Sequence, residues 1–336
     1  TKAALADPNV GSVIIVLTPQ VMTQIEETAH LVGEIASNQH EKPVLGCFMG
    51  EATTGKGERI LAEYNIPNYQ VPERAVAAMA ALAQQRRWQE RPLYKVERFK
   101  VDKKTVRAIF KQVRSEGRTS IGDAEARAVL EAYGIGVPKA KLAENADQAV
   151  EIAEEFGYPV VLKIASPDIL HKTDIGGVRL NLNSATEVRD AFDLIVYRAQ
   201  RHMADARIWG CQVQEMVRGG RETIVGVSRD PQFGPLLMFG MGGIYVEVLK
   251  DVAFRIAPIS RVEATEMVNE IRAYPLLRGV RGEAPADMDA IVEAILRISQ
   301  LVTDFPDNLE LDINPLLTFE RGKGVIGLDA RMVLKQ

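Results

Sequence analysis

Cysteine, long apolar runs and excess positive charge are all scarce in this sequence, and each shortage excludes a class of protein. The 336 residues include two cysteines, Cys47 and Cys211, each isolated in an apolar stretch. Isolated thiols are typical of buried small side chains in a reducing compartment, not of a disulfide framework or a zinc site. No apolar run reaches the roughly 20 residues that a membrane-spanning helix needs. We therefore expect no membrane partner.

The charge balance and the first residues narrow the setting further. The net charge is −4 and the pI about 5.8, which argues against a nucleic-acid partner. The segment Thr1–Asp7 is too short and too polar for a signal peptide, so a cytoplasmic location is expected. Because the chain starts with threonine inside a helical pattern, we expect it to be cut from a longer polypeptide.

The length suggests about two domains, and the pattern of residues 1–94 predicts an α/β domain with a parallel sheet. Val13–Leu17 and Pro43–Met49 are continuous apolar runs, as in strands buried on both faces. Helical stretches separate them, Ile66–Tyr69 is expected as a short third strand, and Pro72 opens an alanine-rich helix. The charged residues 95–105 are expected to be a linker.

Residues 106–336 predict a second domain with a different order of elements. A helix is expected to start at Asp123 as its N-cap and to end at Tyr133, and a second helix should span Asp147–Phe156. Strands and hairpins should then follow at Val160–Ala165, Gly177–Leu182, Ile208–Val217, Glu222–Ser228, Leu236–Phe239 and Ala253–Pro258. A helical stretch over Arg261–Thr303 and two closing strands, Glu310–Asn314 and Val325–Asp329, complete the prediction.

One glycine-rich turn looks like a phosphate-binding loop but lacks an essential group. Gly50–Gly57 follows a strand and precedes a helix, and it nearly spells a P-loop. The residue after Lys56 is Gly57, where the chemistry needs a hydroxyl on Mg²⁺. We interpret the segment as a turn that ends the strand.

The strongest chemical signal lies between residues 160 and 178. Lys163 stands on an apolar strand, where an ammonium without a partner is costly unless it reaches solvent. The loop Ser166–Val178 then places His171 between Lys172 and Asp174, followed by two glycines. A histidine on such a loop can swing and can accept a phosphoryl group, although most histidines only bind their own loop.

The segment Ser166–Val178 is similar to the signature of ADP-forming acyl-CoA synthetases of the acetate–CoA ligase type, relatives of succinyl-CoA synthetase. The resemblance covers nearly the whole chain and implies the carboxy-terminal half of such an enzyme. Residues 1–94 would be a flavodoxin-like ligase domain, incomplete at its start, and residues 106–336 an ATP-grasp domain. His171 would be the phosphorylated catalytic residue and Lys163 a phosphate ligand.

The same resemblance implies further nucleotide contacts and supports a metal site. Nucleotide-binding roles fall on Glu215, Val217, Glu222, Gly240, Gly242 and Gly243. In a strand Asp312 and Asn314 share one face, and Asp329 follows on the next strand. Mg²⁺ prefers a few hard oxygens and keeps phosphate and water as its other ligands. We expect Asn314 and Asp329 to bind Mg²⁺, with Asp312 as a third candidate.

The resemblance also shows what this chain lacks. Its family carries a CoA-binding domain and a first ligase domain, and neither is found here, so CoA should bind to partner domains, on the same chain or on a separate subunit. We expect ATP or ADP as substrate, an oligomer, and phosphoryl transfer between His171 and Mg-ADP. The alternatives are a regulatory region of a protein lysine acetyltransferase, an ATP-grasp carboxylate–amine ligase, and an interaction module without activity.

Overall fold

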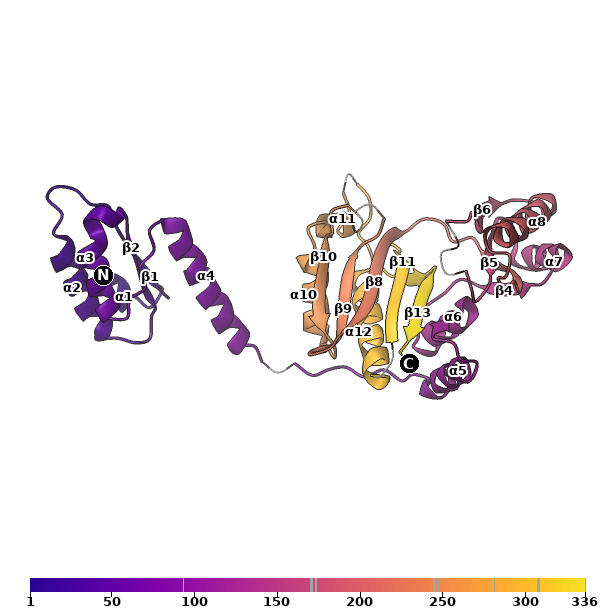
Figure 1. Ribbon diagram of the computed structural model, residues 1–336, viewed down its shortest axis with the longest axis horizontal. Helices are drawn as coiled ribbons and strands as arrows, with labels where there is room; N and C mark the ends of the chain where they lie inside the picture. Colours follow the sequence, from indigo (N-terminus) through magenta and orange to yellow (C-terminus); the bar gives the residue numbers. More distant parts are fainter. Residues whose placement is uncertain are drawn as a thin grey trace. The chain divides into compact units, whose positions relative to one another are not determined.

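The computed structural model divides the chain into two units, Thr1–Leu93 and Tyr94–Gln336, which are considered one at a time (Figure 1). It describes residues 1–92, 94–169, 172, 174–243, 246, 248–280, 282–306 and 309–335. In this part of the chain no helix is both long enough and apolar enough to cross a membrane.

The first unit has a parallel sheet of two strands, β1 (Val13–Leu17) and β2 (Val44–Phe48), which are paired along their full length. Its helices follow the order expected for alternating strands and helices: α1 (Lys2–Ala6), α2 (Ile25–Ser37), α3 (Glu51–Glu63) and α4 (Pro72–Gln89). Leu17 of β1 and residues of β2, α2 and α3 form the core. Strand β2 is buried throughout, as its apolar run predicts, whereas the prediction that β1 is buried on both faces is wrong, because Val16 is 54% exposed. The predicted parallel sheet is confirmed.

The third strand predicted at Ile66–Tyr69 is wrong. Only Asn68 forms an isolated parallel bridge, with Gly46. Pro67 has no N–H to donate, and the Asn68 side chain takes the place of a ladder carbonyl by accepting a hydrogen bond from the Phe48 N–H at 2.8 Å.

The second unit contains two sheets (Figure 1). The small sheet is antiparallel in the order β4 (Ala140–Ala143), β7 (Gly210–Glu215), β5 (Val160–Ala165), β6 (Val178–Leu182). Helices α7 (Ala146–Phe156) and α8 (Ala185–His202) pack on one of its faces and form a core with it. The other face is free to line a cleft.

The large sheet runs in the order β10 (Val252–Ile256), β9 (Gly234–Met241), β8 (Arg221–Asp230), β11 (Leu309–Thr318), β13 (Ala330–Leu334), β3 (Ser120–Ile121), with β12 (Val325–Gly327) paired to β11. The helices of this part are α5 (Lys103–Ser115), α6 (Asp123–Ala132), α10 (Arg261–Glu270), α11 (Tyr274–Leu277) and α12 (Met288–Asp304). Ten residues of α12 are buried, which makes this helix the centre of the larger core.

The local structure differs from the prediction at three places. Helix α8 lies between the predicted strands Gly177–Leu182 and Ile208–Val217, where no element is predicted, although its buried residues recur at helical spacing and Ser184 caps it by accepting from the Glu187 N–H. The helical stretch after Arg261 is three helices, because Ile271 adopts an extended conformation that ends α10. Asp123 is the first helical residue and Gly122 is the N-cap. Asp123 is therefore free to bind elsewhere.

The residues expected as a linker pack on the large unit. The Phe99 N–H donates to Gln300 Oε1 at 2.7 Å, and Gln300 Nε2 donates back to the Phe99 carbonyl at 3.1 Å.

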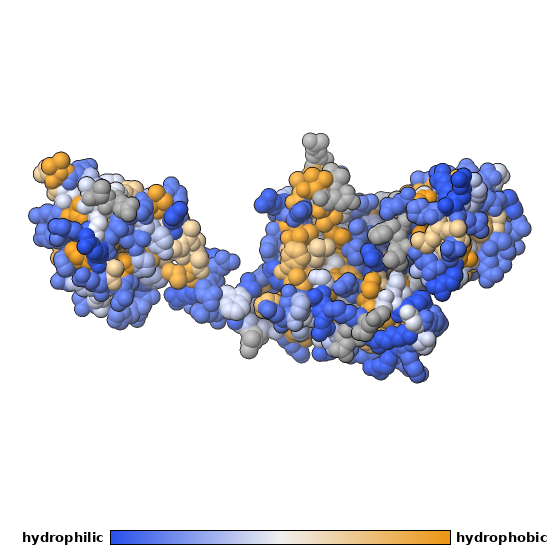
Figure 2. Space-filling model, in the orientation of Figure 1, coloured by the Kyte–Doolittle hydropathy of each residue, from blue (hydrophilic) through white to orange (hydrophobic). Residues whose placement is uncertain are grey.

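Strand β10 lies at one edge of the large sheet. Its side chains Phe254 and Ile256 are exposed and form an apolar surface (Figure 2).

Asp304, at the end of α12, joins three segments of the large unit. Its side chain is 5% exposed and accepts hydrogen bonds from Lys103 Nζ at 2.7 Å, Arg98 Nη1 at 3.2 Å and the Tyr133 hydroxyl at 3.0 Å. Burial raises the pKa of Asp304, but hydrogen bonds from Lys103, Tyr133 and Gln300 lower it by more, so the net shift is downward. The carboxylate is thus held ionised inside the fold.

We predict that Asp304→Ala lowers the free energy of unfolding by about 2 kcal/mol, because the Tyr133 hydroxyl and Lys103 lose a buried acceptor. Urea denaturation at neutral pH measures the change. Glu320→Ala, which removes an exposed ion pair with Lys323, is the control and should cost less than about 1 kcal/mol. Equal effects of the two substitutions would show that the Asp304 cluster is only a surface feature.

Candidate functional site

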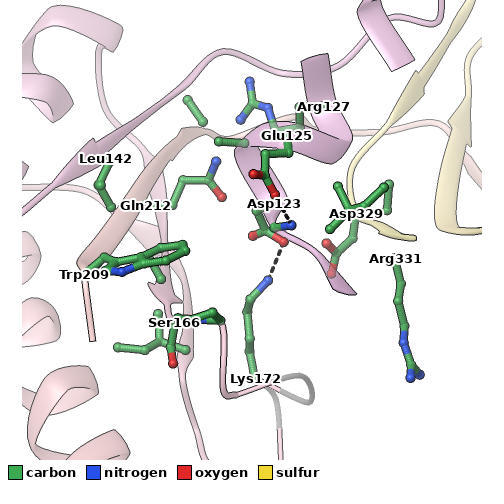
Figure 3. A pocket seen from close by; sticks show the side chains of 18 of the residues that line it. Asp123, Glu125, Arg127, Leu142, Ser166, Lys172, Trp209, Gln212, Asp329 and Arg331 are labelled. Atoms are coloured by element: carbon green, nitrogen blue, oxygen red, sulfur yellow. Dashed lines mark hydrogen bonds and ion pairs between the residues drawn. The ribbon is translucent and has the colours of Figure 1, made fainter. Parts of the chain in front are cut away.

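A cleft of about 1190 Å³ separates the free face of the small sheet from α6 and the strands β11 and β13. Figure 3 shows Gln212, Trp209 and Ser166 on the small-sheet side, with Asp123 on α6 and Asp329 on the opposite wall. The cleft is therefore built from segments far apart in sequence, which is typical of a ligand site between two lobes.

Lys163 connects the small sheet to the segment between β12 and β13 of the large sheet. It lies in the middle of β5, opposite Gln212 of β7, and only 8% of the residue is exposed. Its Nζ donates to the Leu328 carbonyl at 3.1 Å and lies 3.9 Å from Asp329 Oδ1. Burial lowers the pKa of Lys163, and the charges of Asp329 and Asp123 offset this in part. A largely desolvated cation therefore faces the large sheet.

Three oxygen-bearing side chains predicted as metal ligands, Asp312, Asn314 and Asp329, line this same cleft. The Asn314 N–H donates to the Asp329 carbonyl at 3.1 Å, which fixes the strands that carry them. Burial raises the pKa of Asp312; the charge of Asp329 raises it as well, while Arg331 lowers it. Two carboxylates that repel each other beside an amide oxygen suit a cation.

The donor set fits Mg²⁺ shared with a ligand better than a cage made by protein alone. Within the described residues, no group of three or more His, Cys, Asp or Glu side chains is arranged to hold a metal ion. Magnesium is usually bound by one or two carboxylates together with waters and substrate phosphates. Asp329 is half exposed, so it stays accessible to such a complex.

The loop that carries His171 is held by ion pairs at its described positions. His171 itself, with Leu170 and Thr173, lies outside the described residues. Asp168 accepts from the Arg207 guanidinium and backbone N–H, and these hydrogen bonds lower its pKa to about 2. Lys172 Nζ lies 2.6 Å from Asp123 Oδ1, and this pair joins the loop to α6 (Figure 3).

The remaining predicted residues lie outside the main cleft. Glu215 ends β7 and donates its N–H to the Lys139 carbonyl at 2.9 Å, and Val217 follows it, half-buried. Neither side chain lines the cleft wall. Glu215 is thus the last residue of the small sheet at this point, and Val217 lies in the connection that leads to β8 of the large sheet.

Glu222, Gly242 and Gly243 surround a second hollow of about 410 Å³. The Gly242 N–H donates to the Glu222 carbonyl at 2.8 Å, and Gly243 has a φ of 61°, which favours glycine. Gly240 pairs within the large sheet, where a Cβ would lie 2.8 Å from the Asp251 carbonyl. Glu222, Gly242 and Gly243 thus lie together at the second hollow, whereas the metal candidates Asp312, Asn314 and Asp329 line the main cleft.

Sequence reasoning missed Asp123 and Arg127, which both line the cleft from α6. Their spacing of four residues places them on the same face of a helix, and that pattern is visible in the sequence. The partner of Asp123, Lys172, belongs to the motif around His171, but no spacing in the sequence predicts their contact.

We predict that Asp312→Asn raises the free energy of unfolding at pH 7 by about 1 kcal/mol. The folded-state pKa of Asp312 is raised, so ionising it costs stability above that pKa and costs nothing once the pH falls below the unfolded value of about 4. The gain should therefore vanish near pH 4 in urea denaturation. Glu310→Gln, an exposed acid of the same strand, is the control. A variant less stable than the parent at pH 7 contradicts the prediction.

Known proteins resemble this chain in sequence, and the type of domain that they indicate agrees with a ligand cleft between two sheets. Residues 112–334 match the model of the ATP-grasp domain. The chain is 44% identical over 330 residues to 4-hydroxybutyrate–CoA ligase (ADP-forming) of Nitrosopumilus maritimus, covering 98% of this chain and 47% of that protein. It is 48% identical over 228 residues to the beta subunit of acetate–CoA ligase (ADP-forming) II of Pyrococcus furiosus, covering 68% of this chain and 97% of that subunit.

A solved structure shows the same fold in the second unit. It is the dinucleotide-forming acetyl-coenzyme A synthetase 1 of Ca. Korarchaeum cryptofilum, in complex with coenzyme A, Ca-AMPCP and HgCl⁺. It matches with a TM-score of 0.66 and 42% sequence identity over 68% of this chain and 99% of that one.

The cleft between two sheets is therefore that of an ATP-grasp protein. More narrowly, the chain belongs to the family of ADP-forming acyl-CoA ligases of the acetate–CoA ligase type, and the predicted resemblance is confirmed. The chain spans about half the length of the longer curated relatives that it matches, such as the ligase of N. maritimus.

Proposed function

We propose that this chain is the nucleotide-binding, phosphoryl-transferring part of an ADP-forming acyl-CoA synthetase. The observation that carries the proposal is the position of Lys163, whose largely buried ammonium donates to the Leu328 carbonyl and lies 3.9 Å from Asp329, one of the metal-type ligands that line the cleft. A buried cation beside a cleft calls for an anionic ligand, and nucleotide phosphates supply that charge.

In the proposed reaction a phosphoryl group moves between His171 and ADP. In the direction of ATP synthesis, a terminal phosphate oxygen of ADP attacks phosphorus and the bond from phosphorus to the His171 ring nitrogen breaks. The bonding pair returns to that nitrogen, and because the other ring nitrogen carries a proton, His171 leaves as neutral imidazole and ATP forms. Lys163 holds the phosphates and offsets their charge. Magnesium, when bound by Asn314 and Asp329 with Asp312 beside them, would neutralise developing charge on the phosphate oxygens.

Nucleoside contacts are proposed for the end of β7 and for the second hollow. Glu215 and Val217 end the small sheet, where a carboxylate can meet ribose and backbone groups can meet adenine. Glu222, Gly240, Gly242 and Gly243 belong to the large sheet, and backbone N–H groups at glycines can approach phosphate oxygens closely. Gly242 and Gly243 line the second hollow together with Glu222, which supports a shared role in nucleotide binding.

Coenzyme A and the acyl group are proposed to bind to partner domains. Relatives such as the P. furiosus beta subunit match mainly the second unit, and relatives that match the whole chain are about twice as long. The Korarchaeum enzyme was also solved with a phosphorylated phosphohistidine segment. We therefore propose association with the preceding domains of the family, in the cytoplasm, with an oligomer as the working form. The ligases among the relatives do not favour an acetyltransferase regulator.

Phosphate labelling tests the proposal. Incubation of the chain with Mg²⁺ and γ-labelled ATP should give a label that is acid-labile and base-stable, because phosphohistidine has these properties. His171→Ala should abolish the label, and Asn314→Ala combined with Asp329→Ala should lower it strongly by removing the proposed Mg²⁺ ligands. Label that persists in His171→Ala contradicts the assignment of the acceptor. Unchanged Mg²⁺-dependent binding of ADP in the double variant contradicts the metal assignment.

A further inference from the structure

Arg127 is a partly buried cation in the main cleft that has no close ion pair among the described residues. The side chain lines the cleft from α6. Its Nη2 donates to the Pro138 carbonyl, and this is its one hydrogen bond there, whereas Nη1 is buried and has no hydrogen-bond partner. Buried guanidinium donors are almost always paired, so an unsatisfied one indicates a missing partner.

The contacts of Arg127 place it between two proposed parts of the nucleotide site. Pro138, which it binds, precedes Lys139, and the Lys139 carbonyl accepts from the Glu215 N–H at the end of β7. On the other side, Arg127 is close enough to Lys163 for its charge to act on that ammonium. Arg127 is thus linked to the proposed ribose end through the segment Pro138–Lys139, and its charge acts on Lys163 at the proposed phosphate end.

The charges around Arg127 leave it short of negative partners. Burial lowers its pKa, and Glu131 and Asp123 offset this only from a distance. Asp123 is already bound to Lys172 at 2.6 Å. Figure 3 shows the Arg127 guanidinium directed away from the Asp123 and Glu125 carboxylates. Lys163 is a second, largely buried cation near enough for the charge of Arg127 to act on it, and a phosphate group supplies the negative charge that both lack.

We propose that Arg127 is a further nucleotide ligand, whose guanidinium binds a phosphate group of the bound nucleotide together with Lys163. This inference rests on the proposed function. Nη1 is buried and unpaired in the structure, and because one hydrogen bond to Pro138 holds the guanidinium, we infer that its last torsions turn when nucleotide binds and present Nη1 to a phosphate oxygen. The two donors of a guanidinium edge match two oxygens of one phosphate.

The test compares ligands that differ only in phosphate. Dissociation constants for Mg-ADP and for adenosine are measured on the full chain and on Arg127→Gln and Arg127→Lys. Arg127→Gln should weaken Mg-ADP about 10- to 100-fold, the range for a hydrogen bond to a charged group, and leave adenosine within about 2-fold. Arg127→Lys, which keeps the charge and loses the fork, should fall between the parent and Arg127→Gln.

A matched control is Lys141→Gln, because Lys141 lines the same cleft but is half exposed and already paired with Glu155 at 2.6 Å. It should change Mg-ADP affinity less than about 2-fold. The melting temperature without ligand separates binding from structure: it should stay equal or rise in Arg127→Gln, since an unpaired buried charge is removed, and a purely structural residue would lower it.

The outcomes are distinct. Unchanged Mg-ADP affinity in Arg127→Gln overturns the inference, and so does an equal loss for adenosine and Mg-ADP, which would indicate a contact to the base or a hinge role. If Arg127→Gln does not fold, Arg127→Lys carries the comparison. A parent that binds no Mg-ADP contradicts the proposed function itself, whereas a binding parent with an unaffected variant contradicts only the role of Arg127.

Discussion

The cleft depends on one constraint, which is the burial of the Lys163 ammonium on an apolar strand. An ion of this kind is held inside a protein only where other groups pair with it. Here the Leu328 carbonyl and Asp329 reach it from the large sheet, so the two sheets must meet at this point. The contact is partial, since Asp329 lies at 3.9 Å and is half exposed. The fold thereby leaves a cation poised for a stronger anionic partner in the cleft.

Other charges repeat this arrangement across the same gap. Lys172 on the small-sheet side meets Asp123 on α6, while Arg127 of the same helix has a donor without a partner. Opposite them, burial and then the charge of Asp329 raise the pKa of Asp312, which Arg331 lowers in part. Cations and carboxylates are therefore gathered on facing walls without full neutralisation within the described residues, which is the state expected of a site whose charge is completed by a nucleotide and a metal ion.

The sequence predicts the fold best where a run of apolar residues or a family motif alone decides the type of element. The apolar runs of β1, β2 and β5 and the family motif around His171 lead to a parallel sheet and an ATP-grasp domain, and both are present. Helix α8 was missed although its buried residues recur at helical spacing. At Asn68 the reverse happened: a strand was predicted, but the structure has only an isolated bridge, and the Asn68 side chain accepts the hydrogen bond of the Phe48 N–H. Contacts such as Arg127 with Pro138 join loops and helices that no local pattern relates. The residue roles proposed for Glu215 and Glu222 stay predictions.

The account is tested most directly by the thermal stability of Lys163→Met with and without Mg-ADP. If Lys163 is buried for the sake of a ligand, the variant should melt at the same or a higher temperature than the parent when ligand is absent, since a desolvated charge is gone. Saturating Mg-ADP should raise the melting temperature of the parent and leave that of the variant unchanged, because binding to the folded state alone stabilises it. A variant that melts lower without ligand and is still stabilised by Mg-ADP would show that Lys163 serves the fold and not the nucleotide.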